Sequence, residues 1–144
     1  MSATPTRFIR ANIVNEGNVQ VGDVLISRDG TIAAVGAACD THPEAPEAVQ
    51  IDCEGLWLMP GAIDDQVHFR EPGLTHKADI YSESKAAIAG GITSFMEMPN
   101  TNPQTLTQEL LEEKFRIGDK KSLANFTFFM GVSNNNLEEV LKTD

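Results

Sequence analysis

The chain has 144 residues, of which 41% are hydrophobic, and its 21 acidic residues outnumber its 11 basic residues to give a formal net charge of -10. This length suits one globular domain, or a small domain followed by part of a larger one. Because the chain is acidic and has no basic cluster denser than Lys120 and Lys121, we expect neither a nucleic-acid partner nor an anionic membrane partner.

The cysteines and the N-terminal sequence indicate the cellular compartment. Cys39 and Cys53 are the only cysteines and lack the spacing of a redox pair or of a thiolate zinc site, which is typical of reduced cytosolic thiols. The first residues lack the apolar stretch of a signal peptide, and no segment approaches the roughly 20 apolar residues needed to cross a bilayer. The sequence therefore predicts a cytoplasmic protein.

Residues 1–59 are predicted to form a small all-β module. Asp29 and Gly30 lie between two apolar runs, a pattern that indicates a hairpin turn, and Pro43 and Pro46 mark a loop. The apolar runs typical of strands cover residues 8–14, 21–27, 31–35, 49–53 and 56–59.

From Pro60 to residue 144, predicted strands alternate with predicted helices, which favours a parallel sheet. Gly90 and Gly91 end the first helix, and Thr105 with Gln108 has the spacing of a capping box for the second. The strands are expected at residues 62–69, 92–98 and 125–131, and the helices at residues 77–89 and 106–117. The faces expected to cover the sheet are Ile80, Ala87 and Ile88 on the first helix, and Leu106, Leu110 and Ile117 on the second.

A third helix is expected to begin after Asn136, and the sequence ends within about two turns of it. Three strand and helix pairs leave an open sheet edge, whereas a closed (β/α)8 barrel typically needs about 250 residues. The expected fold is therefore α/β, a partial (β/α)8 TIM-type barrel of about three strand and helix units, preceded by the small β module. We interpret the sequence as a fragment, although a complete binding module remains an alternative.

Polar residues in the first barrel strand carry the candidate chemistry. Side chains alternate along a strand, so a row of polar residues shares one face and apolar residues share the other. A buried polar row is costly unless it lines a site for water, metal or substrate, or is satisfied by backbone donors. The polar face holds Asp64, Gln66, His68 and Arg70, and the apolar face holds Ile63, Val67 and Phe69.

Two motifs resemble the dihydroorotases of the amidohydrolase superfamily, in its cyclic amidohydrolase group. Pro-Gly-Ala-Ile-Asp at residues 60–64, followed by His-Phe-Arg-Glu-Pro-Gly at residues 68–73, resembles the first barrel strand of that family. Glu-Met-Pro-Asn-Thr at residues 97–101 resembles the segment that follows its second strand. The order of the motifs and their place on the elements make the match specific, and the resemblance accounts for residues 1–144.

The resemblance implies that His68 is a zinc ligand and that Arg70 and Asn100 bind the carboxylate of the substrate. A planar guanidinium matches a carboxylate, and an amide adds a neutral donor beside it. The catalytic carboxylate and the remaining metal ligands of the family come from later strands, so no catalytic residue is expected within this chain. Because side chains alternate along a strand, Glu97 and Asn100 should point to opposite faces. Glu97 is therefore expected to be paired within the barrel wall.

The sequence departs from the family at Gln66, which stands where the His-X-His pattern has its first histidine. An amide oxygen is a much weaker zinc ligand than an imidazole nitrogen. Three alternatives stay open: Gln66 binds weakly or through water, Asp64 or later residues hold the metal, or the site holds one ion.

The function that the resemblance implies is zinc-dependent hydrolysis of a cyclic amide carbon–nitrogen bond. Its small-molecule substrates would be N-carbamoyl-L-aspartate and L-dihydroorotate, which the enzyme interconverts in pyrimidine biosynthesis; a homo-oligomer is left open. One alternative is another cyclic amidohydrolase, of the allantoinase or dihydropyrimidinase type, although those families typically depart from Arg70 and from Pro99-Asn100-Thr101. A noncatalytic dihydroorotase-like scaffold is the other alternative, and Gln66 is the residue that favours it.

Overall fold

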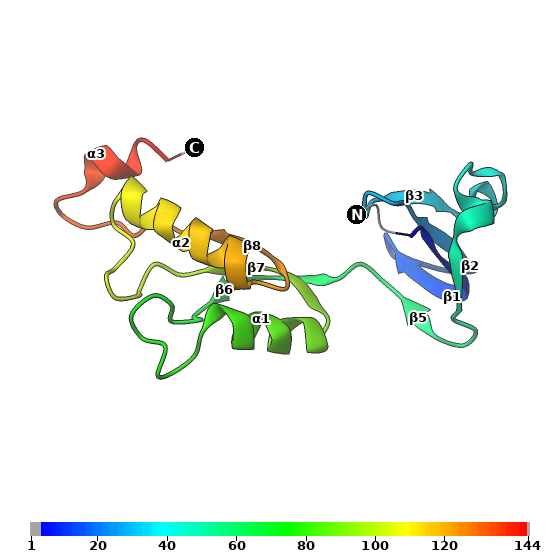
Figure 1. Cartoon of the computed structure of the whole chain (residues 1–144), viewed down its shortest axis with the longest axis horizontal. Helices are drawn as coiled ribbons and strands as arrows, with labels where there is room; N and C mark the ends of the chain where they lie inside the picture. Colours follow the sequence, from blue (N-terminus) through cyan, green and yellow to red (C-terminus); the bar gives the residue numbers. More distant parts are fainter. Residues whose placement is uncertain (1–3, 144) are drawn as a thin grey trace. The chain divides into compact units, whose positions relative to one another are not determined.

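The computed structural model describes residues 4–143 and contains strands together with α-helices and 3-10 helices. Contacts between residues divide the chain into two compact units, Met1–Pro60 and Gly61–Asp144. Figure 1 shows strands β1, β2, β3 and β5 in the first unit, and strands β6 to β8 with helices α1 to α3 in the second. Each unit has its own sheet and its own hydrophobic core.

The first unit is built on a five-stranded sheet with the order β3-β2-β1-β4, and β5 also pairs with β1. The β1–β2 and β2–β3 pairs are antiparallel, whereas β4 and β5 run parallel to β1. The strands are β1 (Thr6–Asn15), β2 (Asn18–Ile26), β3 (Ile32–Val35), β4 (Val49–Asp52) and β5 (Trp57–Leu58). The buried core residues on this sheet are Ala11, Ile13, Val24 and Cys53.

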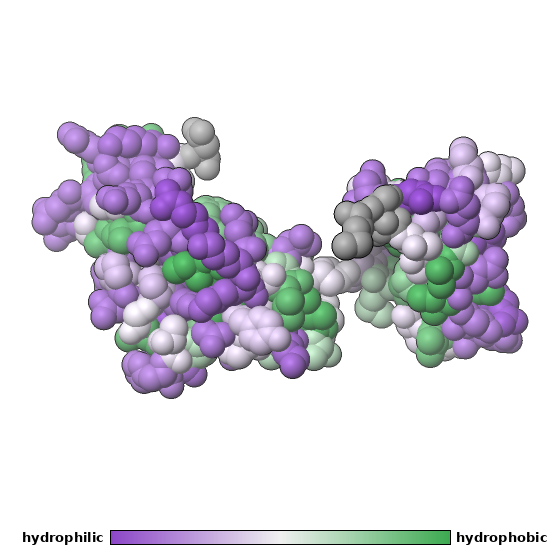
Figure 2. Space-filling model, viewed as in Figure 1, coloured by the Kyte–Doolittle hydropathy of each residue, from purple (hydrophilic) through white to green (hydrophobic). Residues whose placement is uncertain are grey.

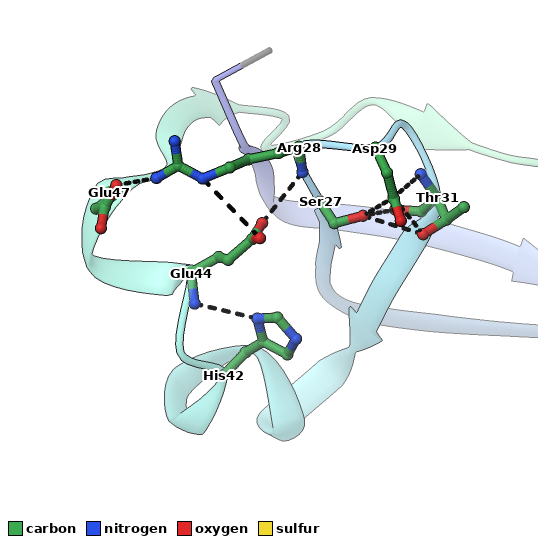
Figure 3. Close-up of polar contacts among 7 residues, drawn as sticks. All are labelled: Ser27, Arg28, Asp29, Thr31, His42, Glu44 and Glu47. Atoms are coloured by element: carbon green, nitrogen blue, oxygen red, sulfur yellow. Dashed lines mark hydrogen bonds and ion pairs between the residues drawn. The ribbon is translucent and has the colours of Figure 1, made fainter. Parts of the chain in front are cut away.

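Two 3-10 helices, η1 (Gly36–Thr41) and η2 (Ala45–Glu47), occupy the segment that was expected to be only a loop, so the unit is not purely β. Polar contacts hold this segment and the β2–β3 turn (Figure 3). Thr31 donates its backbone N–H to Asp29 Oδ1 at 3.0 Å, and Arg28 donates its backbone N–H to Glu44 Oε2 at 3.1 Å. The Glu44 N–H donates to His42 Nδ1 at 3.2 Å. The predicted hairpin turn at Asp29 and Gly30 is confirmed.

The second unit is a parallel sheet of three strands in the order β6-β7-β8. Helix α1 packs against β7, α2 packs against β8, and the two helices contact each other (Figure 1). The elements are β6 (Ala62–Val67), α1 (Ile80–Ala89), β7 (Ile92–Glu97), α2 (Gln108–Lys121), β8 (Asn125–Phe128) and α3 (Leu137–Val140). The core residues between sheet and helices are Phe69, Ile80, Phe95, Leu111 and Phe128.

The start of α2 corrects the predicted capping box. Thr107, not Thr105, is the N-cap, and its hydroxyl accepts a hydrogen bond from the Leu110 N–H at 3.2 Å. Thr105 is buried in the preceding loop, where its backbone N–H donates to Pro99 O at 3.0 Å. The loop uses Thr105 before the helix begins, so local spacing alone placed the cap two residues too early.

The buried faces of the helices also differ from those expected. Leu111, Lys114 and Gly118 are the buried residues of α2. Of the three residues expected to cover the sheet, Ile117 is partly buried and packs against the core. Ile88 on α1 is 43% exposed, and Ser84 is buried instead. A charged residue on the covered face breaks the simple apolar pattern, which is why the pattern missed Lys114.

Apolar side chains remain exposed on both units, and Figure 2 shows them as green patches among hydrophilic residues. Ile63, which was expected on the apolar face of the first strand, is 67% exposed, whereas Phe69 is buried. Among the residues that the structure describes, no helix has the length and apolar character needed to cross a membrane.

Candidate functional site

A local irregularity in β6 changes the predicted polar row. The register of β6 against β7 shifts between Asp64 and Val67, so strict alternation is interrupted there. Asp64 Oδ1 accepts the Gln66 backbone N–H at 3.1 Å, which uses this carboxylate within its own strand. Asp65 and Gln66 together line a hollow of about 330 Å³, with Met98 from the segment after β7 also in its wall.

His68 and Asn100 meet at the carboxyl ends of β6 and β7. His68 Nδ1 lies 2.9 Å from Asn100 Oδ1. An amide oxygen can only accept a hydrogen bond, so the imidazole donates from Nδ1, and the Nε2 of a neutral ring keeps its lone pair. The structure therefore brings together two residues that the sequence singled out and leaves one imidazole nitrogen free to bind a metal.

Arg70 follows β6 in an unusual backbone conformation. Its φ of 70° lies in the left-handed region, which is uncommon for a residue other than glycine. The backbone N–H of Arg70 donates to Glu97 Oε1 at 3.0 Å. Within residues 4–143 the Arg70 guanidinium forms no hydrogen bond or ion pair, so it can bind a ligand, and its joint action with Asn100 stays a prediction.

Glu97 and Lys114 form a buried ion pair behind these residues. Lys114 Nζ lies 2.9 Å from Glu97 Oε2, and their side chains are 1% and 0% exposed. Burial raises the pKa of the Glu97 carboxyl and lowers the pKa of the Lys114 ammonium. The expected pairing of Glu97 is confirmed, whereas Lys114 was missed. The available signal was its spacing from Leu111 and Gly118, which places all three on one side of α2.

Contacts of Glu71 and Pro72 hold the loop after β6. Glu71 Oε2 accepts the Ile80 N–H at the start of α1 at 3.0 Å, and Glu71 also pairs with Lys121 of α2. Asn102, in the loop after β7, donates its N–H to Pro72 O at 3.1 Å. The two loops that carry Arg70 and Asn100 therefore contact each other directly.

The residues present fit one zinc ligand and not a complete zinc site. Within residues 4–143, no three histidine, cysteine, aspartate or glutamate side chains gather where they could hold a metal ion. A catalytic zinc typically has about three protein ligands. His68 offers one suitable nitrogen, and Gln66 lines the hollow with a weaker oxygen donor.

Comparison with solved structures supports a fold of the amidohydrolase kind. The chain is similar to the L-hydantoinase (dihydropyrimidinase) from Arthrobacter aurescens, with a TM-score of 0.85 and 29% sequence identity. This similarity covers 96% of the chain and 30% of the hydantoinase.

Curated relatives and a family profile lead to the family. The chain is 43% identical over 127 residues to an allantoinase from Deinococcus radiodurans, and 45% identical over 93 residues to a dihydroorotase from Carboxydothermus hydrogenoformans. These matches cover 83% and 63% of the chain, which spans 28% and 20% of the two relatives. The dihydro-orotase-like family profile matches residues 55–140, and the chain belongs to that family.

Proposed function

We propose that the protein is a zinc-dependent cyclic amidohydrolase that interconverts N-carbamoyl-L-aspartate and L-dihydroorotate in pyrimidine biosynthesis, in the cytoplasm. The observation that carries this proposal is the 2.9 Å contact between His68 and Asn100 at the carboxyl ends of neighbouring parallel strands. Barrel enzymes assemble their active sites at that end of the sheet. The 45% sequence identity to the dihydroorotase from Carboxydothermus hydrogenoformans also supports this function.

The proposed architecture is the start of a (β/α)8 barrel preceded by a small β module. Three parallel strands in chain order, each followed by a helix, support the barrel, and the similarity to the hydantoinase structure agrees with it. The five-stranded sheet within Met1–Pro60 supports a module that ends close to residue 59.

Arg70 and Asn100 would bind the substrate carboxylate. The Arg70 guanidinium supplies a charged planar fork of N–H donors. Asn100 Oδ1 is used by His68, so only the Nδ2 hydrogens of this amide remain to donate to a ligand. One donor group with a full positive charge and one neutral donor group match a single carboxylate beside a cyclic amide.

His68 would be the zinc ligand that this chain contributes, through Nε2. When bound, zinc polarises an amide carbonyl and lowers the pKa of its water toward about 7. Asn100 fixes the ring orientation, as partners of metal-bound histidines commonly do. Gln66 would bind more weakly or through water, and Asp64 is a poorer candidate because its Oδ1 already accepts the Gln66 N–H.

The test is a substrate panel on the protein as its gene encodes it, with zinc content measured on the same sample. We expect bound zinc and turnover of L-dihydroorotate. Arg70→Gln should lower kcat/KM for dihydroorotate by about a hundredfold, equivalent to a charge-assisted contact of about 3 kcal/mol. Arg116→Gln, at an exposed position on α2, is the matched control and should leave turnover unchanged.

An allantoinase is the second candidate, favoured by the relative from Deinococcus radiodurans. Allantoin has no carboxylate, so its turnover should be insensitive to Arg70→Gln. Turnover of allantoin in preference to dihydroorotate, unaffected by this substitution, would replace the first proposal. A protein without zinc and without turnover of either substrate would support the noncatalytic scaffold.

A further inference from the structure

Two carboxylate oxygens of one buried residue reach two different parts of the candidate site. Glu97 Oε1 accepts the backbone N–H of Arg70 at 3.0 Å, and Glu97 Oε2 lies 2.9 Å from Lys114 Nζ. Glu97 is the last residue of β7, so its carboxylate links the end of this strand to the segment that follows β6.

Lys114 also contacts the segment that follows β7. Its Nζ donates to the backbone carbonyl of Met98 at 3.2 Å, and Met98 precedes Asn100 by two residues. The ammonium also lies over the Phe128 ring, 4.9 Å from its centroid, so an aromatic face contacts the buried charge. Together, Glu97 and Lys114 contact the backbone of the segments that carry Arg70 and Asn100.

Stability alone does not account for this arrangement. Burying two charges carries a desolvation cost, and replacing a buried ion pair by well-packed apolar residues is often neutral or stabilising. Arg70, in contrast, has a φ of 70°, a conformation that persists in a non-glycine residue only where the surroundings hold it. Two hydrogen bonds hold this backbone: the Arg70 N–H donates to Glu97, and the Arg70 carbonyl accepts the Leu74 N–H at 3.1 Å. Of the two, only the bond to Glu97 comes from a side chain and from another strand.

We propose that Glu97 and Lys114 are positioning residues that set the place of Arg70 relative to Asn100, so that both side chains reach one carboxylate of the substrate. Glu97 holds the left-handed backbone of Arg70, and Lys114 holds both Glu97 and the carbonyl of Met98. This inference rests on the proposed function, because it assigns a purpose to the pair within the carboxylate site.

The first unit contains a matched control. Asp23 pairs with Arg7 at 2.6 Å, and Asp23 Oδ1 accepts the backbone N–H of Arg10 at 2.9 Å. Arg10 has a φ of 61°, so the same combination of carboxylate, basic partner and left-handed arginine occurs within the first unit. Asp23→Leu with Arg7→Met therefore reproduces the chemical change without touching the contacts around Arg70.

The experiment compares two double variants of the protein as its gene encodes it. Glu97→Gln with Lys114→Met keeps an oxygen that can accept the Arg70 N–H, whereas Glu97→Leu with Lys114→Met removes it. The readouts are melting temperature, hydrogen exchange resolved to the Arg70 amide, and separate kcat and KM values for dihydroorotate.

We expect both double variants to fold with a melting temperature equal to or above that of the unsubstituted protein. The leucine variant should show faster exchange at Arg70 and a fall of about tenfold to a hundredfold in kcat/KM, mainly through KM. The glutamine variant should recover the slow exchange and most of the KM. The Asp23 and Arg7 control should leave KM unchanged.

Equal KM values and equal Arg70 exchange in the glutamine and leucine variants would overturn the proposal. Unfolding of the leucine variant and of a second apolar filling, Glu97→Met with Lys114→Leu, would also overturn it, because the pair would then serve stability. If the unsubstituted protein does not turn over dihydroorotate, the proposed function fails, while exchange at Arg70 still decides whether Glu97 holds this backbone.

Discussion

Gly73 lies directly against the backbone of Asn102: a Cβ added to Gly73 would lie 1.8 Å from the carbonyl oxygen of Asn102. The φ of Gly73 is 80°, so a side chain would meet both backbone strain and a steric clash. This contact joins the loop that carries Arg70 to the loop that carries Asn100.

Gly73→Ala should therefore destabilise the protein by about 2–4 kcal/mol in urea denaturation, combining the cost of a left-handed alanine with that of overpacking. Gly30→Ala is the control, since Gly30 has a φ of 86° but open space around it. We expect a loss of only about 1 kcal/mol at Gly30. Similar losses at the two glycines would show that the close approach to Asn102 has no energetic weight.

Gly118→Ala should reduce stability although alanine is the better helix former. A Cβ at Gly118 would lie 2.5 Å from Cε2 of the Phe126 ring, where α2 packs on β8. The gain in helix propensity is about 1 kcal/mol, and overpacking a core contact costs about 1–3 kcal/mol. We expect a net loss in chemical denaturation, whereas Asp119→Ala, at the exposed neighbouring position, should be neutral or stabilising. A gain in stability for Gly118→Ala would contradict this packing.

Asn100→Ala should weaken zinc binding by about tenfold to a hundredfold, the usual effect of removing a partner that orients a metal-bound histidine. The physical reason is the 2.9 Å contact that fixes the ring of His68 with Nε2 free. Metal affinity measured by competition with a chelator tests this without an activity assay. Asn125→Ala, at an exposed position in β8, is the control. Unchanged affinity in Asn100→Ala would separate Asn100 from the metal site.

The turn between β2 and β3 should lose stability in acid. Hydrogen bonds from Ser27 and Thr31 lower the pKa of Asp29 from 3.8 to about 2 (Figure 3). A carboxyl whose pKa is lower in the folded state adds stability above its unfolded pKa. That stability is lost as the pH falls from about 4 to about 2. The difference in urea midpoint between the unsubstituted protein and Asp29→Asn should therefore shrink over this range. A difference independent of pH would count against the Asp29 contacts.

The 144-residue chain by itself should hydrolyse no measurable dihydroorotate, even with added zinc. Within residues 4–143 no three histidine, cysteine, aspartate or glutamate side chains gather where they could hold a metal ion, and His68 is the imidazole paired with Asn100. An assay of the purified chain with and without zinc tests this expectation. Turnover that depends on zinc would show that fewer ligands suffice than a catalytic zinc site normally has.

Local sequence patterns predicted much of the chain. The β2–β3 hairpin followed from Asp29 and Gly30, and the order of strands and helices after Pro60 followed from the change in apolar periodicity. These features depend on residues close in sequence, or on a rule of topology that applies to every parallel sheet. The resemblance assigned His68 and Asn100 to one site, and the structure adds a direct contact of 2.9 Å between them.

Contacts between distant segments decided the remainder. The cap of α2 moved to Thr107 because the preceding loop uses Thr105, and the register shift in β6 goes with both Asp65 and Gln66 lining the hollow. Lys114 became a core residue because Glu97, far from it in sequence, supplies the opposite charge. The sequence by itself determined the main strands and α-helices, their order and the residues with suitable chemistry, since those depend on local spacing. Only the tertiary structure decided which polar groups are satisfied by one another, because the free energy of a buried charge depends on partners that local spacing does not reveal.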